Sequence, residues 1–346
     1  MTQLRRKATI YDIAQLSGAS PSTVSAALSG AWKARRISEA TVEAIRRIAG
    51  EQGYSTNMQA RGLRQARSGL VGMVIPFHDN RFFSLMSQSF EAFARDRGLV
   101  PVIACSMRDA SEELRILETL ISYSVEYVFI AGAVAPDRLS ALCQTAGLRH
   151  IFLDLPGPGA PSVISDNLHG STMLTRKLLQ EMPADRVDGL YFLGGDDSDH
   201  ASAARIRAFK AVLTAAGHPA RPDQLLTCGY APSRAKREIA ALCDRLGCLP
   251  AGLFVNSLTA FEGVLGHFVG LPPAAFDQSV IGCYDYDPFA AYLQFPVHMI
   301  RQDSHRMVEE AYRLLDDGNT DPTVREVEPH LIAPRTIYTG PFEDNG

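Results

Sequence analysis

A run of small hydroxyl side chains near the N-terminus is the most informative group of polar residues in the chain. The run comprises Ser20, Pro21, Ser22 and Thr23, with Ser25 and Ala26 one turn later. Serine and threonine hydroxyls can donate to or accept from several base edges, while Pro21 and Ala26 offer apolar contact to thymine methyl groups. The free backbone amides at a helix N-terminus suit phosphates. The pattern therefore predicts a helix that presents its first residues to DNA.

Two short helices are expected to position this run. Thr9 and Asp12 have the spacing of a capping box, and Gly18 ends the first helix. Ser20 is a favourable N-cap, and Pro21 is common at the first helical position. A third helix is predicted after Ser38. Two helices joined at a glycine turn form a helix-turn-helix, whose second helix lies in the major groove.

The charge is divided unevenly along the chain. Residues 1–67 carry eleven Lys and Arg against four Asp and Glu, a net charge of +7, whereas the remaining residues carry 23 against 34, a net charge of −11. A small basic head on an acidic body predicts that only the head meets a polyanion. Thr9 and Tyr11 in the first helix, and Lys33 in the loop after the second, complete the DNA contacts predicted in this head.

From residue 69 onward short apolar runs alternate with amphipathic stretches. The predicted strands are Leu70–Ile75, Val100–Ala104, Tyr127–Ala131, His150–Leu153, Leu190–Leu193, Leu253–Val255, Val280–Cys283 and Val297–Ile300. The predicted helices are 84–97, 111–122, 137–146, 169–181, 201–216, 232–246, 259–269 and 304–317. This alternation favours parallel sheets covered by helices on both faces. One large sheet and two smaller lobes are equally compatible with the pattern.

Several other classes of protein are disfavoured. The chain contains no GxSxG, GxxxxGK[ST], HExxH or strand-following GxGxxG motif, so no enzyme is predicted. The six cysteines form no CxxC pair, and neither a signal peptide nor a long apolar span is evident, which indicates a reduced, cytoplasmic protein with no membrane segment. The acidic loop with Asp196, Asp197, Asp199 and His200 is interpreted as a solvated turn, and neither a metal nor a cofactor is expected.

Three segments of the head resemble the lactose/galactose repressor family of transcription regulators: YDIAQLSGASPSTVS, ISEATVEAIRRIAGEQGY and NMQARGLR. The loop SGAWKARRIS and the later VIPFHDN and VIACS are similar to the fructose repressor (catabolite repressor/activator) branch. The resemblance implies an all-α helix-turn-helix head over residues 1–56, a hinge over 57–67 and a periplasmic-binding-protein-like α/β core over 68–346. The core would have two doubly wound parallel-sheet lobes, about 68–167 plus 297–325 and about 168–296 plus 326–346.

The resemblance also assigns DNA contacts to the hinge. In the family this segment forms a helix on the operator, and a paired leucine enters the minor groove and kinks the duplex. By position that leucine is Leu63, with Ala60 and Arg64 beside it and Asn57 near the phosphates. One departure concerns Ala26, where many members carry Arg or His, so a direct base contact is expected to be missing.

For the core, the resemblance implies an effector in the cleft between the lobes, at the carboxyl ends of the strands. The residues expected there are Phe77, Asn80, Phe83, Ser106, Asp154, Arg205, Ser257, Tyr284, Asp285 and Gln302. Carboxylates and arginine can bind hydroxyl groups, and aromatic rings can cover an apolar sugar face. The alternatives are that Asp154 or Asp285 merely caps a helix and that Arg205 is a surface ion-pair partner.

The expected function is a homodimeric regulator, a repressor of a carbohydrate operon, that binds palindromic operator DNA under the control of a small carbohydrate-like effector. Leu155 stands where the fructose branch has an arginine suited to phosphate, which favours a neutral sugar or polyol. Two alternatives stay open. The effector could be a phosphorylated sugar such as a fructose phosphate, with Arg205 or Arg234 supplying charge, or the output could be activation or dual regulation.

Overall fold

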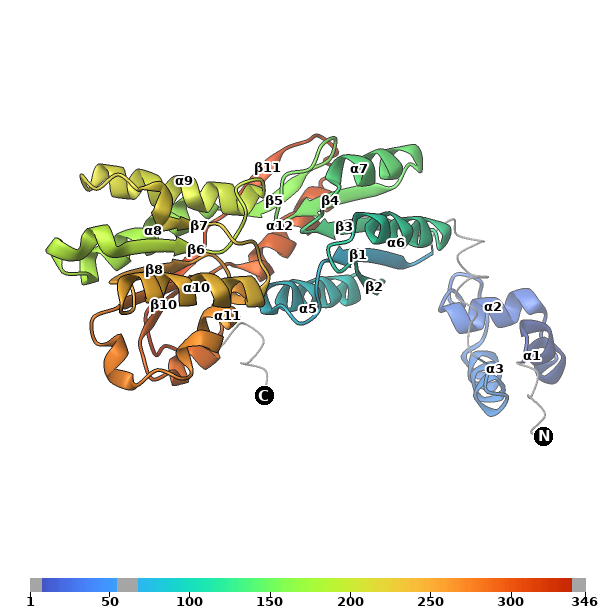
Figure 1. Ribbon diagram of the computed structural model, residues 1–346. Coiled ribbons are helices and arrows are strands. Elements are labelled where there is room, and N and C mark those ends of the chain that lie inside the picture. Colours follow the sequence, from blue (N-terminus) through green and yellow to red (C-terminus); the bar gives the residue numbers. More distant parts are fainter. Residues whose placement is uncertain (1–7, 55–67, 338–346) are drawn as a thin grey trace. The chain divides into compact units, whose positions relative to one another are not determined.

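The computed structural model describes residues 8–54 and 68–337 (Figure 1). The chain divides into two compact units, Met1–Ser68 and Gly69–Gly346. The predicted hinge contacts Asn57, Ala60, Leu63 and Arg64 lie outside the described residues.

The first unit contains three helices, α1 (Ile10–Ser17), α2 (Pro21–Ser29) and α3 (Glu39–Glu51). The predicted caps are confirmed. Thr9 and Asp12 form a capping box, Gly18 ends α1 in the left-handed conformation, and the Ser20 hydroxyl accepts from the amide of Thr23. Ser38 caps α3 in the same way. Ile13, Val24, Val42 and Ile45 form a small core that leaves the N-terminus of α2 at the surface.

The second unit begins with a six-stranded sheet. Its strands are β1 (Leu70–Ile75), β2 (Val100–Cys105), β3 (Tyr127–Ala131), β4 (Arg149–Leu153), β5 (Ser162–Ser165) and β11 (Val324–Val327). They are ordered β11-β5-β4-β3-β1-β2 and all pairs are parallel. Helices α5 (Arg81–Asp96) and α12 (Ser304–Asp316) pack on one face, while α6 (Ala110–Ser122) and α7 (Pro136–Thr145) pack on the other.

A second six-stranded sheet forms the other lobe. Its strands are β6 (Leu190–Leu193), β7 (Leu225–Leu226), β8 (Gly252–Val255), β9 (Val280–Tyr284), β10 (Val297–Arg301) and β12 (His330–Ile332). They are ordered β12-β10-β9-β8-β6-β7, and only the β10–β12 pair is antiparallel. Helices α8 (Asn167–Glu181) and α9 (His200–Ala215) cover one face, and α10 (Pro232–Leu246) and α11 (Leu258–Phe268) the other.

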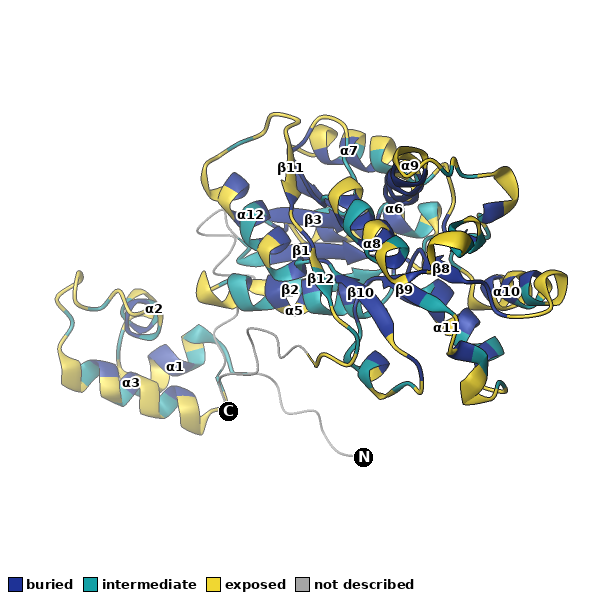
Figure 2. Cartoon of the chain, turned by 90° about the vertical axis from the view of Figure 1, so that its left-hand side faces the viewer, coloured by how far each residue is buried: buried dark blue, intermediate teal, exposed yellow. Residues whose placement is uncertain are grey.

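Burial follows this layered arrangement. The central strands are buried throughout, whereas the helices bury one face and expose the other (Figure 2). Near-continuous apolar strands between two helical layers are what parallel sheets require. All eight predicted strands are present, and the two-lobe alternative is the one that the chain adopts.

The predicted lobe boundary at residue 297 is wrong. Strand β10 pairs with β9 in the second sheet, with Val297 opposite Ile281, so the chain returns to the first lobe only after Arg301. The return to the second lobe also comes later than predicted, because β11 continues to Val327 in the first sheet. The apolar run of β10 is equally compatible with either sheet, and only its pairing partner decides the lobe.

Candidate functional site

A cavity of about 490 Å³ opens between the two lobes. Its wall is built from loops that follow the carboxyl ends of strands in both sheets and from the first turns of the helices that come after them. Phe77, Asn80, Arg108 and Asp154 come from the first lobe, and Asp199, Arg205, Tyr230, Ser257 and Asp285 come from the second. Parallel strands converge at this edge, where a doubly wound fold binds its ligands.

Eight of the ten predicted effector-binding residues line this cavity: Phe77, Asn80, Phe83, Asp154, Arg205, Ser257, Asp285 and Gln302. Ser106 and Tyr284 do not, although we expected them there. Ser106 is 1% exposed directly after β2, and Tyr284 is fully buried at the end of β9. Tyr284 is the last residue of β9 and enters the core, whereas Asp285 lies beyond the strand, has a φ of 78° and faces the cavity.

Arg205 is a buried cation rather than a surface ion-pair partner. It is 3% exposed on α9, and its Nε donates to Asn167 Oδ1 at 2.9 Å while its Nη1 donates to the carbonyl of Asn256 at 2.6 Å. Its guanidinium lies 3.7 Å from the centre of the Tyr284 ring. Tyr284 therefore supports the Arg205 guanidinium from the core, although Tyr284 itself does not line the cavity.

Three carboxylates of the cavity have different environments, which shift their pKa values in different directions. Burial opposes ionisation of Asp199, but hydrogen bonds from the Ser202 amide and the Tyr230 hydroxyl lower its pKa. Burial raises the pKa of Asp285, which accepts a hydrogen bond from Gln302. Burial and the charge of Asp199 raise the pKa of Asp154 to about 7.

Asp154 does not cap a helix, because no hydrogen bond or ion pair joins its side chain to another described residue. Asn80 and Ser257 do cap helices. Asn80 accepts from the amides of Phe82 and Phe83 at the start of α5, and Ser257 accepts from Ala260 at the start of α11. Each keeps a side-chain donor beyond its capping bond, so both can still contact a ligand.

Sequence reasoning missed Arg108, Asp199 and Tyr230, which also line the cavity. Asp199 was expected in a solvated turn, but it is the N-cap of α9 and binds Tyr230. Each of the three follows the end of a parallel strand by a few residues, and that placement is the signal that could have identified them.

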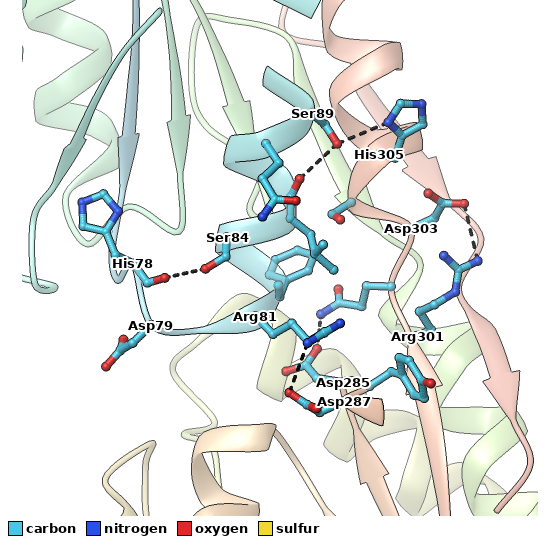
Figure 3. Close-up of a pocket in the computed structure, with 16 residues that line it drawn as sticks. His78, Asp79, Arg81, Ser84, Ser89, Asp285, Asp287, Arg301, Asp303 and His305 are labelled. Carbon is cyan, nitrogen blue, oxygen red and sulfur yellow. Dashed lines mark hydrogen bonds and ion pairs between the residues drawn. The ribbon is translucent and has the colours of Figure 1, made fainter. Parts of the chain in front are cut away.

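A second cavity of about 480 Å³ shares part of this wall (Figure 3). Arg81, Asp285, Asp287 and Gln302 line both cavities. Figure 3 shows Arg81 reaching from the start of α5 toward Asp285 and Asp287, and its Nη1 lies 3.8 Å from Asp287 Oδ2. This ion pair joins the first lobe to the second.

In the head, the structure exposes most of the predicted DNA-contacting residues. Tyr11 is 71% exposed, Ser20, Pro21, Ser22 and Lys33 are exposed, and Thr9, Thr23 and Ser25 are half-buried. Ala26 is the exception, since only 4% of it is exposed, although it does not belong to the core that Val24 and Ala27 help to form. The expected contact of Ala26 with a thymine methyl group stays a prediction, and it would involve only the small part of Ala26 that is exposed.

Comparison with known families agrees with both parts of this geometry. Residues 9–57 match the family described as bacterial regulatory proteins, lacI family, and residues 68–245 match the periplasmic binding proteins and sugar binding domain of LacI family. The chain belongs to the LacI family of bacterial regulatory proteins. It is therefore a DNA-binding transcription regulator with a sugar-binding type of core.

Individual relatives extend this comparison. The chain is 48% identical over 192 residues to the ribitol operon repressor of Klebsiella aerogenes, covering 55% of this chain and 71% of that protein. It is 30% identical over 342 residues to the sucrose operon repressor of Klebsiella pneumoniae, covering 94% and 98%. The crystal structure of the lac repressor dimer bound to operator shares the fold, with a TM-score of 0.78 and 18% identity over 96% of this chain and 99% of that chain.

These named relatives are transcription regulators. Among residues 8–54 and 68–337, no helix is both long and apolar enough to cross a membrane.

Proposed function

We propose that this LacI-family member represses a sugar- or polyol-utilisation operon and that an unphosphorylated polyol or sugar in the inter-lobe cavity controls it. The named relatives regulate ribitol and sucrose operons, which supports a hydroxyl-rich effector. Phe77, Phe83, Asp154, Arg205 and Asp285 supply the rings and charged groups that carbohydrate binding uses. The protein performs no catalysis in this proposal, and it acts in the cytoplasm, where its operator lies.

The charge of the cavity wall is the observation that supports a neutral effector. Six carboxylates line the cavity against three guanidinium groups; the carboxylates are Asp79, Asp154, Asp199, Glu262, Asp285 and Asp287, and the guanidinium groups are those of Arg81, Arg108 and Arg205. A phosphate would enter a net negative field, whereas hydroxyl groups donate readily to carboxylates. Leu155 is half-buried beside Asp154 but does not line the cavity, so the argument rests on the wall rather than on Leu155.

Calorimetric titration with matched pairs tests this proposal. We expect ribitol or an unphosphorylated sugar to bind at least about tenfold more tightly than its phosphate, a difference of about 1.4 kcal/mol. Ribitol with ribitol 5-phosphate, and fructose with fructose 1-phosphate, are suitable pairs. Tighter binding of either phosphate than of its parent would overturn the choice and favour the phosphorylated alternative.

We further propose that two copies of the chain bind one palindromic operator. A helix-turn-helix reads one half-site, so a palindrome requires a homodimer. Ser20, Pro21, Ser22, Thr23 and Ser25 would contact the major groove. In the hinge, Leu63 would enter the minor groove, with Ala60, Arg64 and Asn57 beside it.

A further inference from the structure

Arg108 is the least satisfied cation of the cavity. It follows β2 in the first lobe, and no hydrogen bond or ion pair joins it to another residue among 8–54 and 68–337. Its Nε is buried without a hydrogen-bond partner. Arginine carries five donors and no acceptor, so the donors of Arg108 that reach the cavity have no acceptor among the described residues and are available to a ligand.

Aromatic rings from both lobes hold the Arg108 guanidinium in place. It lies 5.0 Å from the centre of the Tyr230 ring in the second lobe and 5.9 Å from that of Phe77 in the first. Tyr230 is itself fixed, because its hydroxyl lies 2.7 Å from Asp199 Oδ2 and 2.8 Å from Ser202 Oγ. A guanidinium that lies over an aromatic ring can still form hydrogen bonds through its N–H groups.

Asp154 has the complementary requirement in the same cavity. Its carboxylate oxygens accept no hydrogen bond from the side chains and backbone of the described residues, and Asp154 lies within electrostatic range of Arg108. A hydroxyl group donates one proton and accepts through its lone pairs, so a single hydroxyl or two adjacent ones can satisfy both residues.

The backbone supports a functional role for the pair. Arg108 has φ of 55°, Asp154 has φ of 73° and Asp285 has φ of 78°, values that non-glycine residues rarely adopt. These are three of the seven non-glycine residues with positive φ in the described parts of the chain, and all three line this cavity. Unfavourable backbone conformations persist where a site requires a particular direction of the side chain.

We propose that Arg108 is a specificity-determining residue for the effector: held by Tyr230, it donates to an effector hydroxyl that Asp154 accepts from. This inference rests on the proposed function, because it assigns the residues that select a hydroxyl-bearing ligand. This role gives the Arg108 guanidinium a purpose in a cavity that is otherwise rich in carboxylates: it supplies the hydrogen-bond donors that carboxylates lack.

The test uses full-length protein and ribitol in calorimetric titrations. Arg108→Met keeps the length of the side chain but removes its donors, and we expect a loss of affinity of about 10- to 100-fold, as for a lost hydrogen bond to a charged group. Arg108→Lys keeps the charge and should lose less. Arg138→Met, at an exposed position on α7 outside both cavities, is the matched control and should bind like the wild type.

The pH dependence of binding separates a direct role from a structural one. Asp154 is faced by Arg108, Arg205, Asp199 and Asp285, and its ionised carboxylate accepts a hydrogen bond from a hydroxyl more strongly than the protonated carboxyl group does. Wild-type affinity should therefore fall as the pH decreases through about 7. Removal of the Arg108 charge should raise the pKa of Asp154 and move the midpoint of this fall to higher pH, whereas Arg138→Met should leave it in place.

A double-mutant cycle tests the contact with Tyr230. If the ring positions Arg108, Tyr230→Leu should weaken ribitol binding, and its effect should largely disappear when Arg108 is already Met. Unchanged ribitol affinity and pH midpoint in Arg108→Met would overturn the inference while the proposed function stands. A phosphate that binds in preference to its parent through Arg108 would overturn the hydroxyl assignment. Failure of wild-type protein to bind ribitol, fructose or their phosphates would overturn both proposals.

Discussion

Asp154 lies where burial and a neighbouring carboxylate oppose its ionisation, and it also has a proposed role in effector binding. Its pKa of about 7 lies above the ordinary value of 3.8, so its ionisation opposes folding. The cost is absent below pH 3.8, grows between pH 3.8 and 7, and is constant above pH 7. A residue of this kind is retained for binding rather than for stability.

Asp154→Asn should therefore stabilise the free protein while it weakens effector binding. At pH 8 we expect a gain of at least about 1 kcal/mol in the free energy of unfolding, because one pKa unit corresponds to about 1.4 kcal/mol. Below pH 4 the gain should vanish. Denaturant unfolding at several pH values measures this, and lower stability of the variant at pH 8 would contradict the account of Asp154.

The residues missed by sequence reasoning share a physical cause. Arg108 and Tyr230 each follow the end of a strand, but they line one cavity only because loops from two lobes meet, and no local pattern encodes that meeting. The burial of Ala26 was not predictable either, because helical spacing places it on the side of α2 away from Val24, yet only 4% of it is exposed.

At the scale of elements, helix caps and apolar runs were predictable because their causes are local. Ser20, Ser38 and Gly18 act within one helical turn. By contrast β5, β7, β11 and β12 were missed. They are two to four residues long, and three residues of β11 are exposed, so they are strands only through pairing with distant segments.

The two serine caps of the head allow stability and DNA reading to be separated. Ser20→Ala and Ser38→Ala each remove a cap and should lower the stability of the head by about 1 kcal/mol. Only Ser20 stands at the N-terminus of the proposed DNA-reading helix, so only Ser20→Ala should also weaken operator binding under conditions where both heads are folded. Thermal unfolding and fluorescence anisotropy measure the two effects, and equal losses of operator affinity would argue against α2 as the reading helix.

At the scale of the whole molecule, the division of charge matches the division into two units. The net +7 lies within residues 1–67, and the compact second unit begins at Gly69. Operator affinity should therefore fall steeply with salt, because neutralised phosphates release counterions. A fragment of residues 69–346 should bind ribitol like the full chain but bind no DNA, as gel-shift titration would show. Operator binding by the fragment would refute this division of roles.

The central claim is that a ligand in the inter-lobe cavity controls binding of DNA by the head. The most direct test measures operator affinity with and without saturating ribitol, using a palindromic operator selected from a random DNA pool, and measures ribitol affinity with and without that operator. Linkage requires both affinities to change by the same factor, and we predict at least about tenfold for the wild type. Asp154→Asn should show no change at the same ribitol concentration. If ribitol binds the wild-type cavity but leaves operator affinity unaltered, the cavity does not control DNA binding and the account is wrong.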